Sequence, residues 1–144
     1  MTTSTRDEPF GGAKLALLTG RGLVSILRDD VPHIAWPGQW DFPGGAREGR
    51  ESPAACVLRE TREELGLALE PARLIWRQTY PNHRGRAVWF FVARIGADEI
   101  ARIRFGDEGQ GWAVMPVGDY LAHPKGIGQL KARLAEYLAA RPGG

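Results

Sequence analysis

The sequence has little of several features that would mark out a function class. A single cysteine, Cys56, stands among its 144 residues, so no disulfide can form within the chain, and a cytoplasmic setting is expected. No stretch approaches the roughly 20 apolar residues of a membrane-spanning helix, and the first twelve residues lack the apolar run of a secretory signal. We therefore expect no membrane partner and a single domain, residues 1–144, with residues 1–11 as a loose leader.

A strong excess of charge is also missing. Lys and Arg number 19 and Asp and Glu 17, which gives a formal net charge of +2. Proteins that bind nucleic acid polymers do so largely through contacts to phosphates, so we expect no polymeric nucleic acid partner. Sixteen of the 19 basic residues are arginine, whose planar guanidinium suits phosphate groups. Genome base composition can produce the same bias, so it is weak support for a phosphate-bearing ligand.

Short apolar segments between turn residues predict several strands. Gly20-Arg21-Gly22 separates the first two of these segments and predicts a β-hairpin, and the loop at 29–38 follows it. The predicted strands are residues 13–19, 23–28, 72–80, 86–95, 102–105 and 111–115. Because these strands lie before, between and after two helices, the order of elements indicates an α/β or α+β sandwich.

Two segments have helical periodicity. Ser52 is a favourable N-cap before Pro53, and Gly66 can adopt the left-handed conformation that ends a helix, so a helix is predicted from residue 53 to about residue 65. A second helix is predicted at 125–140. The apolar stripes of the two helices are Ala54, Leu58, Thr61 and Leu65 in the first, and Ile127, Leu130, Leu134, Tyr137 and Leu138 in the second.

The first helix carries an unusual concentration of acid. At about 100° per residue, Glu60, Glu63 and Glu64 occupy one face, where like charges repel. Such a face is often only solvated surface, because an arginine such as Arg59 can pair with it. The glycine-rich corner at residues 42–45 favours a different interpretation, since glycine lets the backbone approach a ligand closely. Clustered carboxylates bind hard cations, and Mg²⁺ in particular, so we predict a divalent metal site here.

Residues 45–67 resemble the signature of the Nudix hydrolases, G-x5-E-x7-R-E-U-x-E-E-x-G-U, in which U is a bulky aliphatic residue. Every fixed position matches, in identity and in spacing, over about a sixth of the chain. One position departs from the pattern, because Thr61 stands where an aliphatic residue is usual. The matching residues are Gly45, Glu51, Arg59, Glu60, Glu63, Glu64, Gly66 and Leu67.

The resemblance implies a mixed β-sheet between helices, an α/β/α sandwich. It also implies hydrolysis, with Mg²⁺ or Mn²⁺, of a nucleoside diphosphate linked to a further group. Arg59 would orient a carboxylate, such as that of Glu51, through a salt bridge. The general base would be a glutamate of the signature or an acid of a later loop, for which Glu108 is the first candidate and Asp107 the second. The metal ligands implied by position are Glu60, Glu63, Glu64, the carbonyl of Gly44, and Glu48.

Recognition of the rest of the substrate must come from outside the signature. The small size and the QWDFPGG entry are similar to the compact MutT-like members, which favours a nucleoside di- or triphosphate as substrate. ADP-ribose or a nucleotide sugar is the alternative, and a non-catalytic nucleotide sensor is a third reading that the complete set of glutamates disfavours. The exposed face of the segment 72–95 is the candidate surface for a homodimer. The candidate substrate-binding residues are Trp36, Trp40, Arg47, Arg77 and Tyr80.

Overall fold

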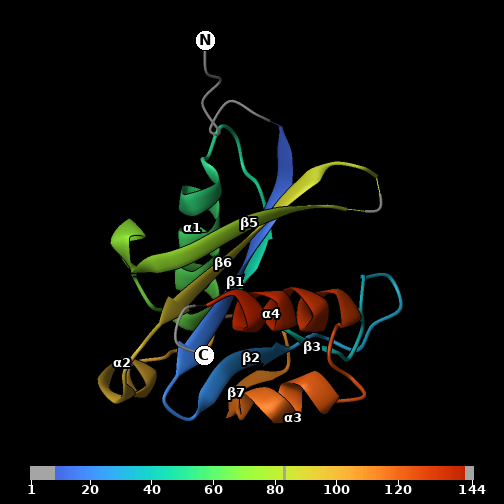
Figure 1. The fold of residues 1–144 in the computed structure, drawn as a ribbon. Helices are drawn as coiled ribbons and strands as arrows, with labels where there is room; N and C mark the ends of the chain where they lie inside the picture. Colours follow the sequence, from blue (N-terminus) through green and yellow to red (C-terminus); the bar gives the residue numbers. More distant parts are fainter. Residues whose placement is uncertain (1–8, 83, 142–144) are drawn as a thin grey trace.

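The computed structural model describes residues 9–82 and 84–141, which form a seven-stranded sheet with helices on both faces (Figure 1). The strands are β1 (Phe10–Thr19), β2 (Gly22–Leu27), β3 (Trp40–Asp41), β4 (Gly44–Ala46), β5 (Leu74–Pro81), β6 (Ala87–Arg94) and β7 (Gly111–Met115). The helices are α1 (Pro53–Leu65), α2 (Ala97–Ala101), α3 (Val117–Ala122) and α4 (Gly128–Ala140), with a 3₁₀ turn, η1 (Pro71–Arg73).

The sheet is mixed, with strand order β3-β2-β1-β6-β5. Strand β1 pairs parallel with β6 along its length and antiparallel with β2 and β4, and β7 pairs with β2. Each half of β1 therefore has a different antiparallel neighbour: Gly12–Lys14 pairs with β4, and Leu18–Thr19 with β2. This arrangement places the start of β1 beside the glycine corner.

The side chains of β1 alternate between two hydrophobic cores. Leu15 and Leu17 belong to the core under α1, and Ala16 and Leu18 belong to the core under α3 and α4. This alternation is the period-2 pattern of a strand that is buried on both faces. The prediction of an α/β/α sandwich with a mixed sheet is confirmed.

Helix α1 has the predicted bounds. The hydroxyl of Ser52 accepts a hydrogen bond from the backbone N–H of Ala55 at its N-terminus, and Gly66 ends it with φ = 69°. Thr61 is fully buried, and its hydroxyl donates to the carbonyl of Val57 over 2.8 Å. Because that bond satisfies the hydroxyl, threonine fits the apolar face at this position. The buried residues of the helix are Pro53, Cys56, Val57, Thr61 and Leu65.

Two expectations about element bounds need correction, and two short helices were missed. Residues 1–8 of the predicted leader lie outside the described residues, but Phe10 and Gly11 belong to β1, where Phe10 is buried. Helix α4 begins at Gly128, about three residues later than predicted. Helices α2 and α3 were not predicted, because each spans only one or two turns, too few for a periodic pattern.

The predicted strand at 102–105 is wrong. Its backbone does not join the sheet but crosses the C-terminal end of α1, where the N–H of Arg104 donates to the carbonyl of Leu65 over 2.8 Å. The N–H of Gly106 likewise donates to the carbonyl of Glu64 over 2.9 Å. Since the last carbonyls of a helix have no partner within it, this segment satisfies them, and it holds the following loop against α1.

Among the described residues, no helix is long and apolar enough to cross a membrane.

Candidate functional site

Arg59 lies at the centre of a cluster of carboxylates. Its Nε is 2.5 Å from Oε2 of Glu51, and its Nη1 lies 3.4 Å, 3.3 Å and 3.0 Å from carboxylate oxygens of Glu48, Glu60 and Glu63. Nη2 donates to the carbonyl of Ala46 over 3.0 Å. Hydrogen bonding to Arg59 lowers the pKa of Glu51. One guanidinium thus holds the loop that carries Glu48 and Glu51 against α1.

Glu64 faces the glycine corner on the inner side of α1. Its Oε1 accepts a hydrogen bond from the backbone N–H of Gly44 over 2.7 Å. Burial raises its pKa to about 7, against the opposing effects of the Gly44 hydrogen bond and the nearby ammonium of Lys14. Glu64 makes no ion pair within 4 Å with any residue in the described ranges. It is therefore a carboxylate with little compensation for its desolvation.

Glu60 lies one turn before Glu64, against Gly45. Burial is the main cause that raises its pKa, with the charge of Arg59 acting in the opposite direction. A Cβ at residue 45 would stand 2.6 Å from Oε2 of Glu60, and a Cβ at Gly44 only 2.1 Å from the carbonyl oxygen of Ala13. Glycine at both positions is thus what allows β4 to lie between β1 and the two carboxylates.

The loop after residue 105 brings Glu108 to the same place. Glu108 and Glu64 both line a small cavity of about 120 Å³, together with Asp41 and Arg28. The loop is fixed by hydrogen bonds from the N–H of Gly109 to Asp29 and from the side chain of Gln110 to the carbonyl of Arg28. Glu108, the first candidate for a base from a later loop, therefore lines the same cavity as Glu64 of α1.

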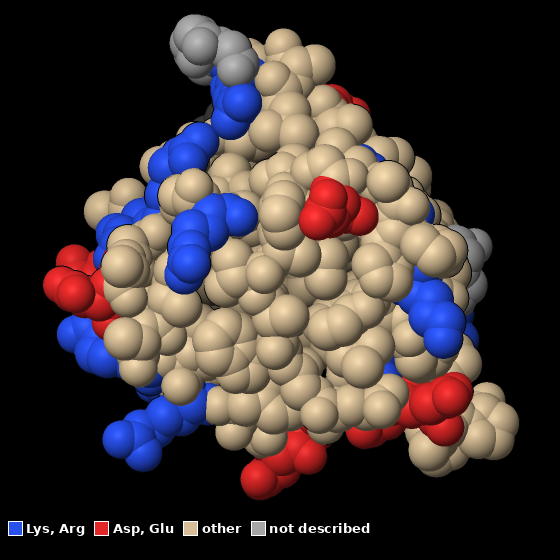
Figure 2. Space-filling view, turned by 90° about the horizontal axis from the view of Figure 1, so that it is seen from below, with Lys and Arg blue, Asp and Glu red and all other residues tan. Residues whose placement is uncertain are grey.

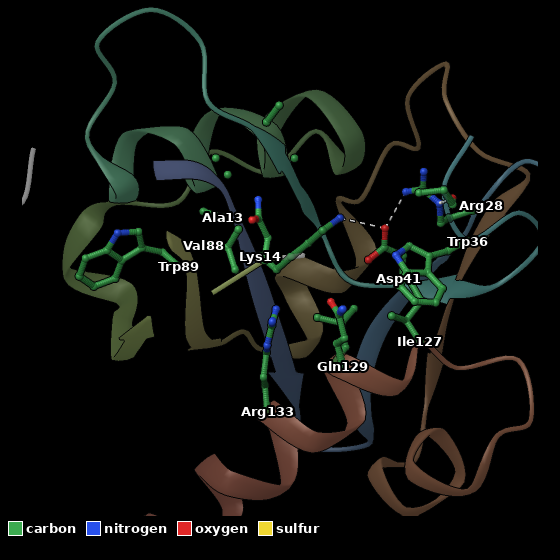
Figure 3. Close-up of a pocket in the computed structure, with 17 residues that line it drawn as sticks. Ala13, Lys14, Arg28, Trp36, Asp41, Val88, Trp89, Ile127, Gln129 and Arg133 are labelled. Carbon is green, nitrogen blue, oxygen red and sulfur yellow. Dashed lines mark hydrogen bonds and ion pairs between the residues drawn. The ribbon is translucent and has the colours of Figure 1, made fainter. Parts of the chain in front are cut away.

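Asp41 is a buried carboxylate that joins two cations. Its Oδ2 lies 2.8 Å from Nζ of Lys14 and 2.9 Å from Nη1 of Arg28, and its Oδ1 accepts from the N–H of Phe42 over 2.7 Å. Figure 3 shows Lys14 and Arg28 reaching Asp41 from opposite sides. Lys14 Nζ also lies 3.4 Å from the carbonyl of Gly44. The pair of cations is thus held beside the glutamate site.

A larger cavity of about 320 Å³ opens on the other side of Asp41 (Figure 3). Gly45 and Ala46 line it too, so it adjoins the acidic helix, and Arg28 and Asp41 border both cavities. Its polar and aromatic side chains come mainly from β1, the loop after β2 and α4. Those with a clear chemical use are Lys14, Arg28, Trp36, Gln129 and Arg133. Trp89 of β6 also borders the cavity, but its ring stacks on Phe91 on the α1 side of the sheet and points away from the other side chains in Figure 3.

Of the predicted substrate-binding residues, only Trp36 lines this cavity. It is 41% exposed and has φ = 54°, which is uncommon for a residue other than glycine. Trp40 does not stay in a free loop: it forms β3, packs on the core under α4 and contacts the ring of His123. Tyr80 is half-buried with the guanidinium of Arg133 over its ring at 4.6 Å, so it touches the cavity only through Arg133.

The two predicted arginines lie outside the cavity. Arg47 packs its guanidinium over the ring of Phe10 at 4.4 Å and donates to the carbonyl of Glu51. Arg77 is exposed on the edge strand β5, 5.6 Å from the centre of the ring of Phe91.

A model of the NUDIX domain matches residues 12–137. The chain belongs to the Nudix hydrolase family. Two curated relatives are named RNA pyrophosphohydrolase. The protein from Acidiphilium cryptum is 37% identical over 106 residues, which are 64% of this chain and 63% of that protein. The protein from Gluconacetobacter diazotrophicus is 33% identical over 122 residues, 70% of this chain and 72% of that protein. The chain thus spans less than two thirds of the first relative's length.

A solved structure shares the Nudix fold. The MutT protein from Methanosarcina mazei Go1 superposes with a TM-score of 0.71 at 16% identity, over 92% of this chain and 96% of that one. At this level of identity the likeness concerns the fold alone, and it agrees with the sheet and helix layers described above.

The Nudix family uses divalent metals, and the donor chemistry of the site fits one. Glu60 and Glu64 are oxygen ligands of the kind that Mg²⁺ prefers, and their burial leaves negative charge that a cation would offset. Within residues 9–82 and 84–141, no group of three or more acidic, histidine or cysteine side chains is arranged so that it could hold a metal ion. Glu48 and Glu63 pair with Arg59 instead.

Sequence reasoning did not assign Lys14, Asp41, Gln129 or Arg133 to the Nudix site. Lys14 gave the only available signal, since it interrupts the apolar run 13–19 with a charge that a buried strand must pair. Asp41 lies 27 residues from Lys14, and Gln129 and Arg133 lie on a helix with an ordinary amphipathic pattern. Only the tertiary fold brings them together.

Replacing Arg59 by Met should destabilise the protein in a pH-dependent way. A carboxyl whose pKa is lowered on folding, as that of Glu51 is from 4.5, stabilises the fold above the unfolded pKa and loses this contribution as the pH falls through the folded value. We expect the variant to lose about 3 kcal/mol of unfolding free energy at pH 7, and the difference to shrink below about pH 4.5. Urea unfolding between pH 3 and 8 measures it.

Arg62→Met is the matched control, because Arg62 is an exposed arginine of the same helix. Its unfolding free energy should stay within about 0.5 kcal/mol of wild type at every pH. A loss for Arg59→Met that stays constant from pH 3 to 8 would contradict the assigned role of the Glu51 pair.

Proposed function

We propose that this Nudix hydrolase cleaves a phosphoanhydride bond of a nucleoside di- or triphosphate, with Mg²⁺ or Mn²⁺, to a nucleoside monophosphate and a phosphorylated remainder. The observation that carries the proposal is that Glu64 and Glu108 line one cavity together with Arg28 and Asp41, while Lys14 pairs with the same Asp41 from the adjoining cavity. Glu60 lies one turn before Glu64, against Gly45. Acidic ligands for a metal and basic ligands for phosphate are what cleavage of a diphosphate requires.

In this proposal the acids divide into two groups. Glu60, Glu64 and the carbonyl of Gly44 would hold a divalent ion, which when bound neutralises phosphate charge and acidifies the attacking water. Glu48 and Glu63 are more exposed and pair with Arg59, so they would join as ligands only by turning away from it. Arg59 is a positioning residue, because it fixes Glu51 and the loop after β4.

Glu108 is the proposed general base. It is exposed at the mouth of the small cavity and belongs to no ion pair among the described residues, so its carboxylate is free to take a proton from water. Glu64 is the alternative, since its pKa of about 7 is near the value that suits a general base at neutral pH. The two roles have different kinetic consequences.

The large cavity would take the nucleotide. Lys14 and Arg28 would bind its phosphates, with Asp41 holding both cations in place. Trp36 would stack on the base, and the amide of Gln129 offers a hydrogen bond to its edge. ADP-ribose and nucleotide sugars stay alternatives that no contact in the cavity favours. A homodimer and a cytoplasmic location stay predictions.

The polyphosphate end of an RNA chain is a second candidate substrate. Its support is that both relatives reported above are named RNA pyrophosphohydrolase. The net charge of +2 argues against tight binding of a long polymer. It does not argue against an enzyme that holds only the terminal nucleotide of one, because the local cavity and not the whole surface would bind it.

Glu64→Gln should leave the fold intact and lower kcat about a hundredfold or more, since a ligand of the ion or the base is lost. Formation of nucleoside monophosphate from the four NTPs with Mg²⁺ or Mn²⁺ measures it. Glu70→Gln, an exposed glutamate outside the site, serves as the control and should match wild type. Unchanged turnover in Glu64→Gln would overturn the metal assignment.

Glu108→Gln should lower kcat by about 10²-fold while KM stays close to wild type, if Glu108 accepts the proton from water. Asp107→Asn changes the neighbouring exposed acid and should have little effect. A rise in KM alone would assign Glu108 to substrate binding and leave Glu64 as the base.

Free nucleoside triphosphate should be hydrolysed with a higher kcat/KM than an RNA oligonucleotide that carries the same nucleotide with a 5′-triphosphate. The cavity of about 320 Å³ has room for one nucleotide, and a net charge of +2 gives the chain little general attraction for a polymer. Pyrophosphate release from the two substrates at equal ionic strength gives the ratio. A preference for the RNA of tenfold or more would establish the second candidate in place of the first.

A further inference from the structure

A separate cavity of about 370 Å³ lies at the far end of β1 from the Nudix centre. The turn between β1 and β2 forms one wall, and the end of β6, the start of α3 and the end of α4 form the others. Figure 2 looks at this end of the molecule from below and shows Lys and Arg side chains mainly along its left side. The cavity shares no lining residue with the two cavities of the Nudix site.

Three arginines from three elements border this cavity. They are Arg21 in the β1–β2 turn, Arg94 at the end of β6 and Arg141 after α4. No acidic residue of the described ranges lines the cavity, and none of the three arginines is within 4 Å of a described carboxylate. Nε of Arg141 is buried and donates to no described acceptor.

This contrasts with the arginines that have a structural role in this protein. Arg28, Arg59 and Arg73 each bind a carboxylate at 2.9 Å or less. Arg21 and Arg94 are exposed, so solvent screens their charges, but the buried Nε–H of Arg141 without an acceptor costs free energy. An anion in the cavity would supply that acceptor and pair with the two exposed guanidinium groups at its rim.

The remaining lining restricts the kind of anion. Leu18, Pro116, Val117 and Leu138 make an apolar floor, and no aromatic ring is among the described lining residues, so no base could stack there. Guanidinium forks match the oxygens of phosphate groups. A single phosphate carries about two charges at neutral pH, whereas three arginines suit a ligand with three or more.

We propose that this cavity binds a multiply charged phosphate, such as a diphosphate or triphosphate group, at a site separate from the Nudix centre. The site does not depend on the proposed catalysis. Helix α4 lines both cavities: Gln129 and Arg133 in its first half line the nucleotide cavity, and Leu138 near its end, with Arg141 beyond it, borders this one. A ligand here would therefore contact the helix that also forms a wall of the nucleotide cavity.

The test uses inorganic tripolyphosphate as the probe, in EDTA so that no divalent ion recruits it to the glutamates. Titration of ¹⁵N-labelled protein should shift the backbone amides of Thr19, Gly20 and Gly22 and leave those of Gly44 and Gly45 unchanged. Calorimetry in the same buffer should give one bound probe per chain. Shifts centred on Lys14 and Gly44, or none up to 10 mM probe, would overturn the proposal without any variant being needed.

Two variants that remove the same amount of charge distinguish a specific site from non-specific attraction of the probe to a positive surface. Replacing Arg21, Arg94 and Arg141 together by Gln should weaken binding at least tenfold. The matched control replaces Arg62, Arg102 and Arg104, three exposed arginines outside the cavity, by Gln and should retain wild-type affinity. Equal weakening in both variants would show non-specific attraction and refute the site. Loss of NTP hydrolysis in Glu64→Gln with probe binding intact would confirm that the two sites are independent.

Discussion

The Nudix site depends on one shared cation. Arg59 contacts carboxylates on two segments, Glu48 and Glu51 in the loop after β4 and Glu60 and Glu63 on its own helix. Without it, that loop would have to approach a helix face of the same charge. With it, the loop closes on α1, and β4 is held between the helix and β1. The glycines of β4 complete the arrangement, because any side chain there would collide with Glu60 or with the backbone of β1.

Arg59 also divides the acids into two electrostatic environments. On its side of the helix, hydrogen bonding to the guanidinium lowers the pKa of Glu51. On the inner side, burial outweighs the available positive charge and raises the pKa of Glu60 and of Glu64. A carboxylate that is desolvated and only partly compensated is costly to keep in a fold unless it has a function. The same glutamates that look redundant in the sequence thus have distinct physical roles in the structure.

Features that depend on local patterns were predictable from the sequence, whereas features that depend on long-range contacts were not. Ser52 and Gly66 set the ends of α1 through interactions within a few residues, and both ends are confirmed. Residues 102–105 have the composition of a strand, but their N–H groups bond to the end of α1, a choice that only the tertiary fold makes. Because this segment crosses the end of α1, the loop that follows it places Glu108 in the same cavity as Glu64. The pairing of Asp41 with Lys14 has no sequence signature. Trp36 and Trp40 were both expected to be free in a loop rich in proline and glycine; Trp36 is exposed and lines the cavity, but Trp40 forms β3 and packs on the core.

The small net charge of the chain hides the fact that its acidic and basic residues are concentrated in different places. A net charge of +2 arises from 19 basic and 17 acidic residues that are not mixed evenly. Acids gather on α1 and its entry loop, two cations flank Asp41 beside them, and arginines surround the cavity at the far end of β1. Screening limits surface charges to interactions over about 8 Å at physiological ionic strength, so each cavity presents its own local charge to a ligand. The local set of charges around each cavity, and not the net charge of the chain, therefore determines which ligands that cavity attracts.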